Sequence, residues 1–204
     1  MDSYSTRGNS IFCTFVTVLG TCAVLNHLTT FLPMERFETK PQATIELNKV
    51  HQMTLNTYLN QEESIFSFDL KYDLSTEFHW NMNQLFLYVV ASYNDTTTNQ
   101  RNEVTVWDKI VRNKEDAVFK KKNVLVEYPL RDEKRELKNR KVRLHLRYRT
   151  MPITGVMWEK EVARSSFQIP GEYFRDASAA TREEAAKKEK KKAAQMGLED
   201  WQYR

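Results

Sequence analysis

The side chains best suited to acid–base or nucleophilic chemistry in this sequence are histidines, and three of them, His51, His79 and His145, lie after residue 40. A serine nucleophile needs a base within hydrogen-bonding reach and usually a glycine-rich turn that exposes its hydroxyl. The sequence contains no G-x-S-x-G motif, and its histidines are scattered rather than paired as H-x-x-x-H. These spacings favour surface or structural roles, and they leave open a membrane-anchored hydrolase whose triad is assembled only in space.

Metal and cofactor sites are not indicated either. Cys13 and Cys22 both lie in an apolar N-terminal segment, so no cysteine can complete a metal site with the later histidines or form a disulfide within the body. There is no phosphate-binding glycine loop and no dinucleotide fingerprint. Asp69 and Asp73 share the polar face of an expected strand, where paired carboxylates are usually just solvated. The sequence therefore predicts no catalytic residue, no metal ligand and no cofactor.

One expected strand presents a basic face made of Arg143, His145, Arg147 and Arg149. Such a face could meet anionic headgroups or an acidic partner surface, or it could be a solvated strand face. The formal net charge of the chain is only +4, and no aromatic residues interleave with these cations as in a nucleic-acid platform. We therefore expect no nucleic-acid partner.

The segment Ile11–Leu32 is the strongest organising feature of the chain, because it contains no charged residue over 22 positions and precedes Pro33. Roughly 20 apolar residues in a helix cross the hydrocarbon core of a bilayer. A cleaved signal peptide with a small-residue site near Thr21–Ala23 is the rival interpretation, but the apolar run continues beyond that point. The segment is therefore predicted to be a transmembrane anchor.

Polar groups inside this anchor need partners. Thr21, Asn26 and His27 are candidates for contacts with a neighbouring helix, a headgroup or water. The basic residues do not fix the orientation, since Arg7 on one side is balanced by Arg36 and Lys40 on the other.

Alternation of apolar and polar residues predicts short strands after the anchor. It is clearest in Ile65–Leu74 and Val142–Tyr148, while Leu85–Val90 is a continuous apolar run typical of a strand covered on both faces. Loops are expected at His51–Glu63 and Arg131–Lys141. The remaining expected strands are Thr44–Leu47, Glu103–Val111, Val124–Tyr128 and one within Val156–Ile169.

The expected fold is all-β: a single N-terminal transmembrane helix followed by an antiparallel β-sandwich, with a charged, partly helical C-terminal tail. The predicted segments are a leader (1–10), the anchor (11–32), one sandwich domain (33–176) and a Lys/Glu/Ala-rich tail (177–204). A glycosylation acceptor, Asn94-Asp95-Thr96, occurs in a polar run that is typical of a loop, and this favours a lumenal location for the body.

Two tryptophan-centred motifs carry a resemblance to a known family. They are Trp80-Asn81-x-x-Gln84-Leu85-Phe86-Leu87-Tyr88 and Val106-Trp107-Asp108-Lys109-Ile110, with Asn94 between them and Arg7-x-Asn9-Ser10-Ile11-Phe12 at the start of the anchor. In order and spacing these motifs resemble subunit 3 of the eukaryotic signal peptidase complex, the 22/23-kDa glycoprotein subunit family. The resemblance covers about Ser5 to Tyr173, and the tail lies outside it.

The resemblance implies a single-pass type II protein of the endoplasmic reticulum membrane, with a signal-anchor, a cytosolic N-terminus and a lumenal sandwich. It implies a non-catalytic accessory subunit in a hetero-oligomer, which supports the serine-type catalytic subunit in removing signal peptides from nascent secretory proteins. The alternative is a free-standing, membrane-anchored lumenal binding module with an Ig-like sandwich.

By the same resemblance, the two motifs supply residues of the sandwich core or of the contact with the catalytic subunit. Trp80, Phe86 and Trp107 are expected to pack inside. The other candidates for either role are Asn81, Gln84, Leu85, Asp108 and Lys109.

Overall fold

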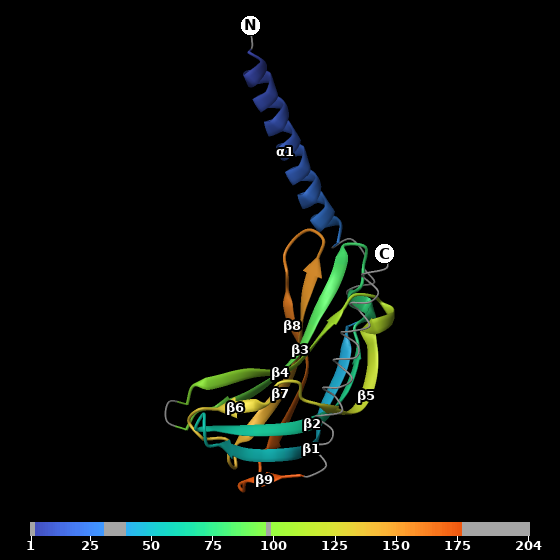
Figure 1. Cartoon of the computed structure of the whole chain (residues 1–204). Coiled ribbons are helices and arrows are strands. Elements are labelled where there is room, and N and C mark those ends of the chain that lie inside the picture. Colours follow the sequence, from blue (N-terminus) through green and yellow to red (C-terminus); the bar gives the residue numbers. More distant parts are fainter. Residues whose placement is uncertain (1–2, 31–39, 97–98, 177–204) are drawn as a thin grey trace, which may run out of the picture.

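The computed structural model describes residues 3–30, 40–96 and 99–176, so the predicted tail (177–204) lies outside the described residues. The described part contains one long helix, two short 3-10 turns and nine strands (Figure 1). The elements are α1 (Tyr4–Thr29), β1 (Gln42–Asn56), β2 (Gln61–Asp73), η1 (Ser75–Glu77), β3 (Met82–Asn94), β4 (Arg101–Val111), η2 (Glu115–Ala117), β5 (Val118–Leu125), β6 (Leu130–Asp132), β7 (Lys141–Pro152), β8 (Glu159–Gln168) and β9 (Phe174–Arg175).

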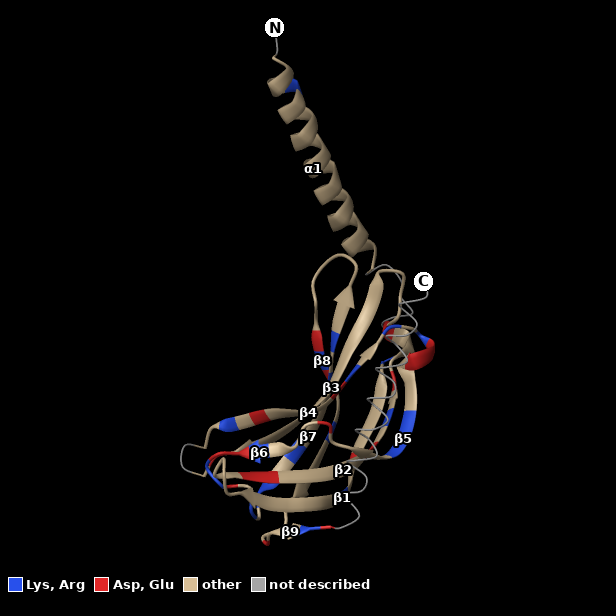
Figure 2. Cartoon of the chain, in the orientation of Figure 1, with Lys and Arg blue, Asp and Glu red and all other residues tan. Residues whose placement is uncertain are grey.

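Helix α1 projects from one end of the strand-rich body, and none of its residues Tyr4–Thr29 is buried (Figure 1). It is long and apolar enough to cross a membrane, and its 26 residues span about 39 Å at 1.5 Å per residue. Charged side chains are absent from α1 except near its first turns (Figure 2). The helix begins at Tyr4 rather than Ile11, because the Ser3 hydroxyl caps it by accepting from the Ser5 N–H at 3.2 Å.

The strands form two antiparallel sheets that face each other, which confirms the expected sandwich. One sheet has the order β5-β2-β1-β9, with β6 also paired to β2, and the other has the order β4-β3-β7-β8. The core lies between them and follows the predicted alternation. The inward-facing side chains of this alternation are Phe66, Phe68, Leu70, Tyr72, Val142, Leu144, Leu146 and Tyr148, and Leu74 just after β2 is buried with them.

The first hairpin differs from the prediction, because most of the expected loop His51–Glu63 belongs to β1 and β2. Two register shifts between β1 and β2, at Leu47/Lys49 and Val50/Gln52, interrupt the alternation that would have revealed the strand. The connecting turn is short and ends at Asn60, whose φ is 56°. Two smaller differences are that β5 begins at Val118 rather than at Val124, and that the start of the expected loop Arg131–Lys141 belongs to β6.

A similar irregularity decides the position of the second tryptophan. Between β3 and β4 the register shifts at Val89/Val90, which pair with Trp107 and Thr105. As a result Val106 and Trp107 are both buried, instead of lying on opposite faces of the strand as strict alternation predicts. Trp107 meets Phe68 of the other sheet edge-on, with ring centroids 6.3 Å apart.

Candidate functional site

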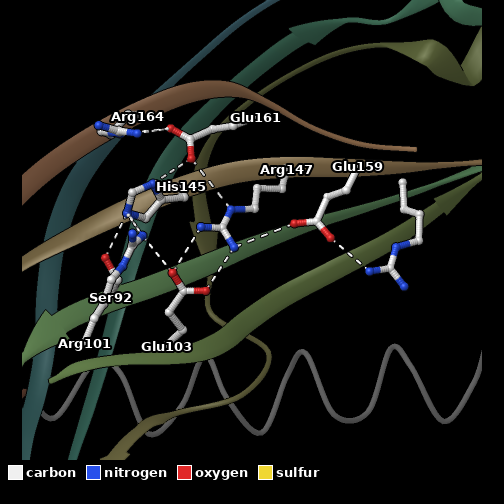
Figure 3. A network of polar contacts seen from close by, with 9 residues as sticks. Ser92, Arg101, Glu103, His145, Arg147, Glu159, Glu161 and Arg164 are labelled. Atoms are coloured by element: carbon white, nitrogen blue, oxygen red, sulfur yellow. Dashed lines mark hydrogen bonds and ion pairs between the residues drawn. The ribbon is translucent and has the colours of Figure 1, made fainter. Parts of the chain in front are cut away.

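The outer face of the β4-β3-β7-β8 sheet carries a network of charged side chains (Figure 3). Strand β7 supplies the predicted basic face, and the acids come from its neighbour β8 and from β4, which lies two strands away. The Arg147 guanidinium donates to both carboxylate oxygens of Glu103, at 2.9 and 3.1 Å, and Arg149 donates to Glu159 at 2.9 Å. Arg149 and Glu159 lie directly opposite each other on adjacent strands, where opposite charges stabilise a sheet. At Arg147 and Arg149 the predicted basic surface is therefore matched within the chain, and these cations are not available as an uncompensated patch.

The centre of this network is His145, which is only 1% exposed although it lies on the outer face. Its Nε2 is 2.8 Å from the Ser92 hydroxyl, and its Nδ1 is 3.0 Å from Glu161 Oε2. Ser92, His145 and Glu161 thus follow the serine–histidine–carboxylate order of a hydrolase triad. Arg101 adds a further contact, with Nη2 at 3.1 Å from His145 Nε2.

Two of these three residues, Ser92 and His145, are enclosed within the sheet. Arginine can only donate, so Nε2 of His145 accepts from Arg101 and the ring proton sits on Nδ1, facing Glu161. Burial lowers the pKa of His145, although the hydrogen bond to Glu161 acts in the opposite direction. Ser92 is 1% exposed near the C-terminal end of β3, and no glycine adjoins it in the sequence to expose its hydroxyl. The arrangement joins β3, β4, β7 and β8.

Sequence reasoning missed the acidic half of this network. Glu103, Glu159 and Glu161 lie on β4 and β8, far in sequence from the arginines they bind, and Arg147 and Glu103 are 44 residues apart. The available signal was the i, i+2 spacing of Glu159 and Glu161 in the last strand. Among the described residues, no group of three or more His, Cys, Asp or Glu side chains is placed to hold a metal ion.

The other two body histidines also have local partners. His51 is buried, and its Nε2 lies 2.9 Å from the Ser67 hydroxyl on β2, the neighbouring strand of the same sheet. His79 accepts a hydrogen bond from the backbone N–H of Asn81 at 3.2 Å. The structure therefore does not bring His51 and His79 together with His145 in one site.

The predicted contact residues lie in several different environments. Leu85 and Trp107 are core residues. Asn81 is also buried, and it fastens the start of β3 to the β7–β8 loop: its amide donates to the Thr154 carbonyl at 2.8 Å and accepts from the Thr154 N–H at 3.1 Å. Lys109 lies at the edge of the sandwich, where its ammonium is 4.5 Å from the centre of the Phe119 ring.

Trp80 and Phe86 are not core residues, contrary to the prediction. Trp80 is 56% exposed because it lies in the turn before β3. Phe86 is half-buried on the outer face, since Leu85 and Leu87 on either side of it point into the core. Its ring stacks on that of Tyr88 at 5.3 Å, and it pairs across the sheet with Ile110.

Two further predicted residues, Gln84 and Asp108, are partly buried beside these outer-face aromatic residues. Gln84 donates to the Met151 sulfur at 3.2 Å. Asp108 pairs in register with Tyr88, and its hydrogen bond with Tyr128 raises the pKa of that phenol. Gln84, Phe86, Tyr88, Asp108 and Ile110 are thus members of the two motifs that lie toward the outer face.

The polar residues of α1 occupy two environments. Thr21 bonds back to the Thr17 carbonyl at 2.9 Å, so its hydroxyl is satisfied within the helix. Asn26 and His27 lie near the C-terminal end of α1, and the side-chain oxygen of Asn26 is buried without a hydrogen-bond partner among the described residues. His27 lies against Gly155 in the β7–β8 loop of the same chain.

The acceptor Asn94 is at the end of β3 that is farther from α1, where its amide donates to Asn99 at 3.1 Å.

Fold and site together define a two-sheet antiparallel sandwich that carries one helix of membrane-spanning length, with a buried polar cluster that joins four strands. A family model described as a signal peptidase subunit matches residues 1–172. "Signal peptidase complex subunit 3" of Dictyostelium discoideum is 36% identical over 177 residues, which is 87% of this chain and 99% of the relative. The protein of the same name from Drosophila melanogaster is 33% identical over 181 residues, covering 85% and 97%. The chain belongs to the signal peptidase subunit family.

Proposed function

We propose that this chain is a non-catalytic accessory subunit of a signal peptidase complex in the endoplasmic reticulum membrane. The observation that carries the proposal is the family match over residues 1–172, together with relatives named as subunit 3 of that complex. In this proposal α1 anchors the chain, the N-terminus is cytosolic and the sandwich is lumenal. The sandwich supports the catalytic subunit, which removes signal peptides from nascent secretory proteins.

The buried polar cluster supports the non-catalytic part of the proposal. A nucleophilic serine must reach its substrate, whereas Ser92 is enclosed within the sheet. The Arg101 guanidinium also occupies a position at His145 Nε2, the atom that would have to accept the serine proton. A Ser92–His145–Glu161 hydrolase is the second candidate function, because the two hydrogen bonds have the required geometry.

The test is a mild-detergent pull-down of the full chain from membranes, with identification of the co-purifying proteins and an assay of signal-peptide cleavage. Recovery of a catalytic signal peptidase subunit, with cleavage that survives Ser92→Ala, supports the accessory role. Cleavage by the chain alone that Ser92→Ala abolishes would establish the hydrolase instead. Recovery of the chain alone without activity would favour a free-standing binding module.

We assign the contact with the catalytic subunit to the outer face around Phe86. The stacked Phe86–Tyr88 pair and the 47%-exposed Ile110 form an apolar surface beside a network whose charges are matched. Interfaces are enriched in such partly exposed aromatic residues. Phe86→Ala should reduce co-purification of the catalytic subunit while the melting temperature stays near that of the wild type. Tyr58→Ala, at an exposed turn, is the matched control. Unchanged co-purification in Phe86→Ala would contradict the assignment.

Orientation is tested at Asn94. A lumenal body exposes the Asn94-Asp95-Thr96 acceptor to glycosylation, so the chain should shift to lower apparent mass after treatment with an endoglycosidase, and Asn94→Gln should abolish that shift. Protection of the body from added protease in intact microsomes is the second readout. Digestion of the body in intact microsomes would show the opposite orientation.

A further inference from the structure

The end of the sandwich that lies against α1 exposes an unusual group of large apolar side chains. Trp80 precedes β3, and the others belong to the loop that joins β7 to β8. Their exposed fractions are between 53% and 67%. The members of this rim are Trp80, Ile153, Val156, Met157 and Trp158. Contiguous exposed apolar surface on a protein marks an interaction site.

The rim lies at the end of the helix of membrane-spanning length. His27 and Thr30, at the C-terminal end of α1, line a small pocket together with Asn81, Val156 and Trp158. Gly155 comes so close to α1 that a Cβ atom added there would be 2.1 Å from His27 Nδ1. The β7–β8 loop therefore lies beside the C-terminal end of α1 (Figure 1).

The rim carries no charge. Residues 150–158 contain no Asp, Glu, Lys or Arg, and neither do residues 78–94, which include Trp80 and all of β3. Charged residues resume along β8 with Glu159 and Lys160, farther from α1 (Figure 2). A surface that faced water or an acidic or basic partner would be expected to carry charge here, whereas the headgroup boundary of a bilayer suits tryptophan beside aliphatic side chains.

The loop is fixed rather than loosely exposed. The Asn81 carbonyl accepts from the Ile153 N–H at 2.8 Å, and the Asn81 side chain bonds to Thr154. At the other end of the loop, the Trp158 N–H donates to the Thr150 hydroxyl at 2.9 Å. Because its backbone is tied at both ends, the loop pays little conformational entropy when its side chains enter another medium.

We propose that this rim inserts into the interfacial layer of the same bilayer that α1 crosses, so that the body is attached to the membrane at a second point. The inference rests on the proposed anchoring by α1. The occupant of the rim is a phospholipid surface, recognised through apolar burial and through tryptophan at the headgroup level. Since the rim has no charge, zwitterionic phosphatidylcholine is sufficient and anionic lipid is not required.

The test places the full chain, carrying Trp201→Phe to remove the tail tryptophan, in phosphatidylcholine vesicles that contain lipid with a nitroxide quencher near the headgroup. The quencher should reduce the tryptophan fluorescence, and most of this reduction should disappear in the double variant Trp80→Phe/Trp158→Phe. Trp107 is common to both proteins and is buried in the core. The thermal unfolding of both proteins is compared to show that the double variant folds.

A matched control uses the opposite end of the sandwich. Tyr58 is 99% exposed in the β1–β2 turn. This turn lies near the C-terminal end of β3, because Asn60 of the turn contacts Arg135 and the adjacent Glu136 accepts from the N–H of Thr96, just after β3, at 2.7 Å. The 13 residues of β3 place this end roughly 40 Å from Met82. Tyr58→Trp, added to the double variant, should be quenched by iodide in the water and not by the labelled lipid.

Quenching of Trp80 and Trp158 by iodide, without quenching by labelled lipid, would overturn the inference while leaving the anchor intact. Flotation of the vesicles at alkaline pH distinguishes failure of the rim insertion from failure of the anchoring by α1. A chain that does not float with the lipid would refute the anchoring and the inference together. Protection of these tryptophans only when the chain is bound to other subunits would show that a protein covers the rim and would also refute the lipid assignment.

Discussion

Trp80 and Trp107, the tryptophans of the two tryptophan-centred motifs, provide a direct test of the packing described above. Trp107 is 8% exposed and packs against Phe68 of the opposite sheet, whereas Trp80 is 56% exposed. Replacing a buried tryptophan by alanine costs about 3–5 kcal/mol of unfolding free energy. This is a large part of the roughly 5–15 kcal/mol that stabilises a typical domain. For a domain of about 130 residues each kcal/mol lowers the melting temperature by about 3–5 °C, so Trp107→Ala should lower it by about 10–20 °C.

The assay is calorimetric unfolding of the full chain in a mild detergent, with wild type, Trp107→Ala and Trp80→Ala compared under the same conditions. Trp80→Ala removes the same atoms from an exposed position and should change the unfolding free energy by less than about 0.5 kcal/mol. Trp107→Phe keeps a ring against Phe68 and should fall between the two. A melting temperature for Trp107→Ala within about 3 °C of the wild type, or an equal loss in Trp80→Ala, would refute this account of the core.

Three further predictions concern the polar network and the junction with α1. Burial lowers the pKa of His145, so below pH ~6.5 the unfolded chain binds the proton more readily than the folded chain. The melting temperature should therefore fall as the pH is lowered from about 7 to about 5. His145→Gln should reduce this dependence of the melting temperature on pH. Arg147→Met should cost about 1–2 kcal/mol by chemical denaturation, because it leaves Glu103 without its two-point partner, and Arg147→Lys should restore less than half of the loss; equal stability of all three proteins would contradict the network. Gly155 has a φ of +111°, so Gly155→Ala should cost about 1–3 kcal/mol, and His27→Ala in the same chain should recover only the steric part; full recovery would show that the backbone is unstrained.

Strands with unbroken alternation could be predicted from the sequence, because a period of two directly reports one buried face. The alternating residues of β2 and β7 occupy their predicted faces, although Ser67 and His145 are buried on the faces that were expected to be exposed. The length of β1 and the burial of both Val106 and Trp107 could not be predicted, since the bulges that cause them leave no signal in a period-two pattern.

The candidate site was harder to predict than the fold for a different reason. The outer-face network depends on which strands are neighbours, and the pairing of β7 with β3 and β8 is a property of the tertiary fold. The basic residues of β7 were visible in the sequence, but their partner Glu103 lies two strands away in the same sheet. Trp80 was assigned to the core because large aromatic residues are usually buried, and its position in a turn before β3 reversed that expectation.

The connections made by Asn81 and β9 determine when the sandwich can be completed during synthesis. Asn81 bonds to Thr154, which is 73 residues later, and Gln52 and Met53 of β1 pair with Arg175 and Phe174. At roughly 5–20 residues per second the ribosome needs about 4–15 s to reach Thr154 after making Asn81. Until β7 (Lys141–Pro152) has been made, the edge of β3 that pairs with β7 stays open, and this edge is where the nascent body can pair with another chain.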